Sequence, residues 1–305
     1  TQSQVATAQK PLKQEEKSFW CKADELLKLG IDEISEEDMV TGVRSLNVMD
    51  EKAASNLGQE LLNNAVKDAR ANNVRVFQPG NTEYQRVKAI SDRVIASSHY
   101  RNNSAVTYAV IDYPSFGAFA YGGGTYVIYK GLMDATNDAE LAYVIAHEIA
   151  HSSAGHIHEK LALNWFKDKT GNKPPENFSK SLTNTTEQEA DKIAVIYTAL
   201  AGYDPCASAT IWEKRKTSIN DLAWVRTHQA NPRRAATNRQ WCATAKQYWV
   251  PGQVNPNAEK LLKCNALYCN VSRDDMKSCS GGGVFAALEV LADSYIKNQE
   301  AKKEQ

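Results

Sequence analysis

Apolar positions along the chain recur mainly at helical spacing, and the sequence therefore predicts a mostly helical protein. In one such segment Val87, Ile90 and Val94 line a single face of an amphipathic helix. Asn137 precedes another helix and Glu140 follows three residues later, an arrangement typical of a capping box. Helices are predicted over residues 83–97, 138–159, 186–201 and 284–297, and residues 19–73 have a charged, helical pattern.

Strand patterns are few and short. Residues 74–77, 106–111 and 125–129 are rich in β-branched or aromatic side chains, and Pro114 with the glycines at 122–124 marks turns between the last two. The predicted fold class is therefore α+β and mainly helical, with one small sheet.

Composition divides the chain into four predicted parts. We expect a disordered leader over residues 1–18, a helical region over 19–79, a central domain over 80–245 and a cysteine-containing extension over 246–305. Within the third part, residues 167–185 carry glycine and prolines, which predicts a mobile loop.

The charge balance excludes some classes of function. The 305 residues contain 36 Lys and Arg against 36 Asp and Glu, so the chain has no basic footprint for nucleic acid. The charge-free stretch 193–203 is too short for a transmembrane segment. The chain begins at Thr1 without an apolar signal segment, so we expect that its N-terminus has been trimmed. A cysteine that carries a lipid would lie in the segment that has been removed.

The cysteines indicate a compartment. None of the six belongs to a C-x-x-C pair, which weakens the case for a zinc ribbon or a thioredoxin-type motif. A disulfide framework in an oxidising compartment fits better than free buried thiols, although the pairing stays open. The cysteines are Cys21, Cys206, Cys242, Cys264, Cys269 and Cys279.

The strongest chemical signal is an H-E-x-x-H motif inside a predicted helix. One helical turn places His147 and His151 on the same face, where two imidazoles can bind one Zn²⁺. Glu148 lies beside them and can reach a water on the metal. The alternative interpretation is a pair of surface histidines on an amphipathic helix.

A zinc site needs a third protein ligand. The metzincin extension requires Gly at 154 and His at 157, where this chain has Ala154 and Ile157, so that branch is excluded. His156 and His158 flank the required position. We expect both to be structural or exposed, with His156 pointing away from the ligand face of a continuing helix.

The better candidate lies in Thr-Glu-Gln-Glu-Ala-Asp at residues 186–191. Glu187 and Asp191 are four residues apart and share a helix face, so one can bind metal while the other accepts a ligand histidine's ring N–H. Glu189 is expected to point elsewhere. Taken alone, such an acidic cluster at a helix start usually complements the helix dipole.

These residues carry a family resemblance that covers roughly residues 80 to 240. The chain resembles gluzincin metallopeptidases of the CaaX prenyl protease and HtpX type. The membrane helices of those branches are absent, so it is most similar to the soluble exported branch, often found in bacterial envelopes. The matching segments are Ala118-Phe119-Ala120, Gly122-Gly123, Tyr126-Val127, Glu140-Leu141, His147 to His151, His156, Glu187 to Asp191, and Thr227-His228 with Pro232 and Arg234.

The resemblance implies a zincin-like domain with one Zn²⁺ per chain, bound by His147, His151 and Glu187. It further implies that Glu148 is the catalytic base and that Asp191 and Arg234 support the ligands from behind. His228 and Arg234 would lie on a loop over the cleft, although Gln229 stands where the family usually has proline. Two hypotheses remain for His228: it stabilises the oxyanion, or it plugs the open metal position until the loop moves.

The segment at residues 125–129 suggests how a substrate binds. An exposed edge strand there would pair with an extended peptide, making Tyr126, Val127 and Ile128 substrate-binding residues. The alternative is an interior strand of the small sheet.

The predicted function is a zinc metalloendopeptidase, a hydrolase acting on unfolded or misassembled envelope proteins, including outer-membrane or periplasmic ones. We expect it in the periplasm or another extracytoplasmic compartment, either free or held by a lipid anchor on a missing N-terminus. The alternative is a chaperone-like envelope protein that binds peptides and cleaves little.

Overall fold

The computed structural model describes residues 35–37, 40, 44–46, 50–102, 106–157, 176–214 and 232–263. Its strands are β1 (Ser35–Glu37), β2 (Arg44–Leu46), β3 (Thr107–Ile111), β4 (Ala118–Gly122) and β5 (Thr125–Tyr129). Its helices are α2 (Glu51–Ala71), α3 (Thr82–Ala96), α4 (Lys130–Ala135), α5 (Asp138–Ser153), α7 (Glu176–Leu200), α8 (Ala207–Lys214), α10 (Pro232–Ala245) and α11 (Ala258–Lys263), with a short 3-10 turn at Lys246–Tyr248. The α+β, mainly helical prediction is confirmed.

The larger sheet has the strand order β3-β5-β4. Strand β5 runs parallel to β3, with Thr107 opposite Thr125, and antiparallel to β4, with Ala118 opposite Ile128. The prediction that residues 125–129 form an exposed edge is therefore wrong, because both sides of β5 are hydrogen-bonded. Tyr126, Val127 and Ile128 are buried in the interior of the domain. Strands β3 and β4 form the two edges of the sheet instead.

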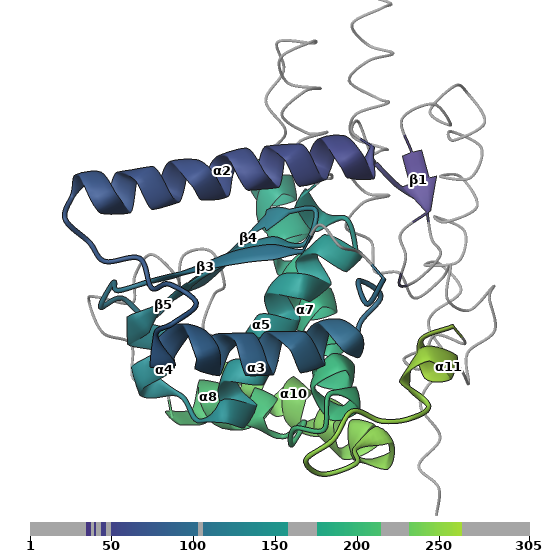
Figure 1. The fold of residues 1–305 in the computed structure, drawn as a ribbon. Coiled ribbons are helices and arrows are strands. Elements are labelled where there is room, and N and C mark those ends of the chain that lie inside the picture. Colours follow the sequence, from purple (N-terminus) through teal and green to yellow (C-terminus); the bar gives the residue numbers. More distant parts are fainter. Residues whose placement is uncertain are drawn as a thin grey trace, which may run out of the picture.

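The sheet lies between two helical layers (Figure 1). Helix α2 covers one face, where Leu62 packs with Val127. Helices α3 and α5 lie against the other face, where Ile90 and Ile145 join Tyr126 in the main core. The sheet is thus buried on both faces and supports α5 from one side.

A close backbone contact fixes α2 on the sheet. Gly123, in the turn between β4 and β5, has a φ of +54°, and a Cβ there would lie 2.3 Å from the Cα of Ser55 on α2. Only glycine accommodates both the left-handed backbone and this approach. The contact positions the end of β4 relative to α2.

Helix α5 forms the centre of the domain. Asn137 caps its N-terminus and forms the predicted capping box with Glu140, so the start of the helix is confirmed. Every residue from Glu140 to Ser153 is buried, because α3, α7, α8 and the sheet surround the helix. Residues that face one another across α5 and α7 are therefore shielded from water.

The structure corrects several boundaries. Helix α5 ends at Ser153 and not at residue 159, and α7 begins at Glu176, within the predicted loop 167–185. Strands β1 and β2 interrupt the region expected to be helical, and residues 74–77 contribute a single bridge between Val76 and Ile111. The leader 1–18, residues 158–175, the segment with His228 and the final helix at 284–297 lie outside the described residues.

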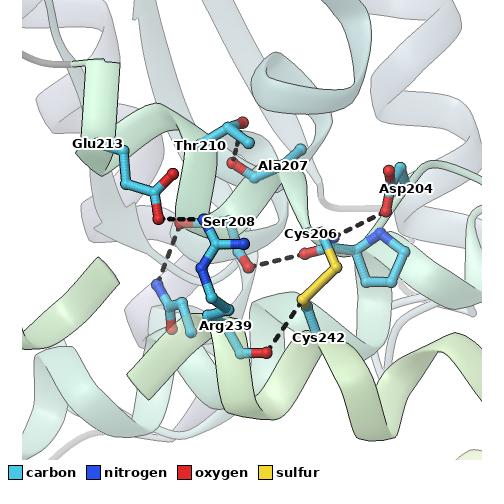
Figure 2. The surroundings of a disulfide bond; sticks show 10 residues. Asp204, Cys206, Ala207, Ser208, Thr210, Glu213, Arg239 and Cys242 are labelled. Carbon is cyan, nitrogen blue, oxygen red and sulfur yellow. Dashed lines mark hydrogen bonds and ion pairs between the residues drawn. A yellow bond between two sulfur atoms is a disulfide. The ribbon is translucent and has the colours of Figure 1, made fainter. Parts of the chain in front are cut away.

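A disulfide links Cys206, just before α8, to Cys242 on α10 (Figure 2). It joins two helices that both pack against the central pair, and Cys242 is buried. The other four cysteines lie outside the described residues. Among the described helices, none is sufficiently long and apolar for a transmembrane span.

Candidate metal centre

Three buried side chains converge between α5 and α7. His147 and His151 come from successive turns of α5 and Glu187 comes from α7, and one ligand atom of each lies within 4.8 Å of the others. The two Nε2 atoms are 3.1 Å apart. Each Nε2 lies 3.4 Å from one carboxylate oxygen of Glu187. The predicted set is thus brought together from two helices.

These distances fit a tetrahedral zinc ion. Ligand atoms at about 2.0 to 2.1 Å from zinc in tetrahedral geometry lie about 3.3 Å from one another. The three measured separations are close to that value. Two imidazoles and a carboxylate also match the donor set of catalytic zinc sites, which leave a fourth position for water or substrate.

Asp191 organises the outer side of His147. Its Oδ1 lies 3.1 Å from His147 Nδ1 and accepts a hydrogen bond of 2.6 Å from the hydroxyl of Tyr143. Asn238 on α10 donates to the same hydroxyl at 3.0 Å. This network turns His147 so that Nε2 faces Glu187.

Arg234 supplies the positive charge of the centre. Its Nε and Nη2 donate to the two carboxylate oxygens of Asp191, and Nη1 lies 3.5 Å from Glu187. The guanidinium also stacks 4.2 Å from the ring centroid of Trp212. The resemblance implied a loop position for Arg234, which is wrong: the residue is buried on helix α10, because its side chain pairs with Asp191.

The surroundings shift the pKa values of the two histidines in opposite directions. Burial lowers the pKa of His147, but hydrogen bonds and charges from Asp191 and Glu187 outweigh it and raise the pKa to about 9. Burial lowers the pKa of His151 to about 3 despite Glu187. Burial of Asp191 is likewise outweighed by Arg234 and His147, which hold its pKa below the usual range. A divalent ion would replace the proton of His147.

Glu148 is buried one residue after His147. The pKa of Tyr121 on β4 is raised to about 12, first by burial, then by Tyr129 and then by the negative charge of Glu148. The carboxylate of Glu148 is therefore within electrostatic reach of the edge strand.

Sequence reasoning missed two residues beside the ligands. His156 was expected to point away, yet it is buried with its Nδ1 2.9 Å from Nδ1 of His151. Glu189 was expected to point elsewhere, yet its Oε2 lies 3.5 Å from Nε2 of His156. Gly155 was the available signal, because glycine commonly ends a helix and lets the chain turn back.

Comparison with known proteins places these residues in a family context. Residues 81–167 match the model of Peptidase family M48. This range contains the H-E-x-x-H helix and His156.

Several characterised proteins are similar to the chain. Mitochondrial metalloendopeptidase OMA1 of Arabidopsis thaliana is 30% identical over 142 residues, covering 41% of this chain and 29% of that protein. Metalloprotease LoiP of Escherichia coli is 26% identical over 155 residues, covering 45% and 61%. The Beta-barrel assembly-enhancing protease of Yersinia pestis is 28% identical over 178 residues, covering 49% and 35%. The chain thus spans less than two thirds of each relative.

Proposed function

We propose that this chain, which carries a Peptidase family M48 domain in residues 81–167, is a zinc-dependent endopeptidase. The observation that carries the proposal is the buried convergence of His147, His151 and Glu187 beside Glu148. The named relatives are metalloproteases, which supports the same activity.

Each residue has a part in the proposed reaction. His147, His151 and Glu187 would hold zinc, which when bound supplies a Lewis acid and lowers the pKa of a water toward about 7. Glu148 would accept a proton from the attacking water and deliver it to the leaving amine. Asp191 and Arg234 would orient His147 and balance the buried carboxylates.

The open edge of β4 is our candidate for substrate pairing, in place of β5. Tyr129 N donates to Gly117 O at 3.0 Å, so in this antiparallel pair the polar backbone groups of Ala118 and Ala120 turn away from β5. Within the described residues, β4 pairs with no strand on that side. An extended peptide added there would bind through its backbone, which suits substrates without a common sequence.

The substrates we propose are unfolded or misassembled proteins of the cell envelope. One similar protein is named a Beta-barrel assembly-enhancing protease, which favours substrates of this kind. The Cys206–Cys242 disulfide favours an oxidising compartment, such as the periplasm.

The role of His228 stays a proposal with two versions, because the residue lies outside the described structure. As an oxyanion stabiliser, His228→Ala should lose most of its turnover. As a plug of the open metal position, the same variant should be more active than the wild type.

Casein cleavage tests the proposed function. The wild type should cleave casein, and a zinc chelator should abolish cleavage until zinc is restored. Glu148→Gln should retain zinc and lose activity, Glu187→Ala should lose zinc, and Glu213→Gln on the exposed part of α8 is the matched control. If the wild type binds casein and never cleaves it, the chaperone-like alternative replaces the peptidase.

A further inference from the structure

A second histidine lies against the outer edge of a proposed zinc ligand. The ring centroids of His151 and His156 are 5.0 Å apart, and their Nδ1 atoms are separated by 2.9 Å. Both rings are buried. His156 therefore occupies the position beside His151 that Asp191 occupies beside His147.

The end of α5 creates this contact. The helix stops at Ser153 with Ala154 as its C-cap, and Gly155 has a φ of +67°. This left-handed residue reverses the chain, so His156 returns to the ligand face. On a continuing helix, the same residue would lie well away from that face.

A metal bound to His151 would fix the hydrogen-bonding roles of the two rings. His151 directs Nε2 toward His147 and Glu187, so a metal bound there requires Nε2 to be unprotonated. The single proton of the neutral ring is then on Nδ1, which donates to Nδ1 of His156. His156 in turn carries its proton on Nε2, which faces the carboxylate of Glu189 at 3.5 Å.

We propose that His156 is a positioning residue for the metal ligand His151 and that Glu189 orients His156 in turn. The proposal rests on the metal site of the proposed function. His156 would select the His151 tautomer that can bind metal and hold its ring in line with Glu187. The effect on metal affinity should be larger for His156 than for Glu189, because the two rings are 2.9 Å apart whereas Glu189 is 28% exposed and lies 3.5 Å from His156.

The two ligand histidines are then held by different partners. His147 faces the carboxylate of Asp191, which pairs with Arg234, whereas His151 faces the imidazole of His156 with the carboxylate of Glu189 behind it. Each ligand has its own acceptor on its outer nitrogen, so the loss of His156 should loosen one ligand and leave the other in place.

Two substitutions separate a hydrogen bond from simple packing. His156→Asn places a carbonyl oxygen near the position of Nδ1 and keeps an acceptor for His151. His156→Leu has a comparable volume and no acceptor. Glu189→Gln removes the charge behind His156, and Glu213→Gln is the control for an exposed glutamate that pairs with Arg239 and with none of the ligands.

Zinc affinity, measured by competition with a chromogenic chelator, is the decisive readout. His156→Leu should bind zinc roughly 10- to 100-fold more weakly than the wild type, and His156→Asn should recover most of that loss. The visible spectrum of the Co²⁺ form should change in His156→Leu and resemble the wild type in His156→Asn. Glu189→Gln should weaken zinc binding by less than tenfold, and it provides the test should His156→Leu fail to fold.

The outcomes distinguish this proposal from the proposed function. Equal zinc affinity in the wild type and His156→Leu overturns the positioning role and leaves the metal site intact. Equal losses in the Leu and Asn variants also overturn it, because packing would then explain both. A wild type that binds no zinc removes the metal site itself and this proposal with it.

Discussion

Arg234 on α10 grips Asp191 on α7 with two parallel hydrogen bonds, Nε to Oδ2 at 2.7 Å and Nη2 to Oδ1 at 2.5 Å. Both side chains are buried, so the pair fixes α10 against α7, the helix that also carries Glu187. Removing one partner of a buried pair leaves the other charge uncompensated, at a cost of about 3 to 5 kcal/mol.

Arg234→Met should therefore lower the free energy of unfolding by about 3 to 5 kcal/mol, measured by urea denaturation. Arg239→Met on the same helix is the matched control, because Arg239 pairs with Glu213 at the surface. That exposed pair should contribute less than about 1 kcal/mol. Equal losses in the two variants would contradict a special role for the Asp191 pair.

Ala120→Pro tests the edge of β4. Proline removes an N–H that points away from β5 and leaves the ladder with β5 intact, so the fold and the zinc content should be unchanged. One lost backbone hydrogen bond of about 1 kcal/mol predicts roughly a fivefold fall in kcat/KM for casein. An unchanged kcat/KM in a folded, zinc-loaded variant would rule out pairing at this residue.

The Cys206–Cys242 disulfide should contribute substantially to stability. It closes a loop of 36 residues, and constraining such a loop in the unfolded chain is worth about 4 kcal/mol. A Cys206→Ala/Cys242→Ala variant should therefore unfold at a lower urea concentration than the wild type. A reductant should destabilise the wild type and have a smaller effect on the variant; identical sensitivity would show that other cysteines are responsible.

His99 predicts how stability depends on pH. Burial lowers its pKa to about 4, only partly opposed by a hydrogen bond that the ring donates to the backbone of Leu262, and its Nδ1 lies 2.6 Å from the hydroxyl of Tyr197. Because the unfolded chain takes up this proton near pH 6.5, the stabilising contribution is complete above that pH and falls as the pH drops toward 4.

Between pH 7 and pH 5, the wild type should therefore lose about 2 kcal/mol more of its unfolding free energy than His99→Gln. Urea denaturation of both proteins in chelator at each pH measures the difference, since chelation removes any contribution from bound metal. Parallel losses in the two proteins would show that other groups cause the acid sensitivity.

Local patterns were sufficient to predict much of the site, and long-range packing explains what they missed. The capping box at Asn137 and the helical spacing of His147 and His151 are properties of neighbouring residues, and both are confirmed as structure. Residues 118–122 alternate small and aromatic side chains, a pattern that does not predict a strand. The sequence therefore gives no sign that β4 pairs with one side of β5. His156 was missed because its contact depends on where α5 ends.

The spread of the centre over α5, α7 and α10 also makes its assembly depend on the last of these helices. A nascent chain that ends before α10 contains Glu187 and Asp191 but lacks the guanidinium that balances them. Without Arg234 these two carboxylates lose one of the positive groups that face them, so burying them between α5 and α7 costs more free energy. The centre is therefore complete only when α5, α7 and α10 have packed together, so a chain cut before α10 would keep the three candidate ligands and lose the cation that faces them.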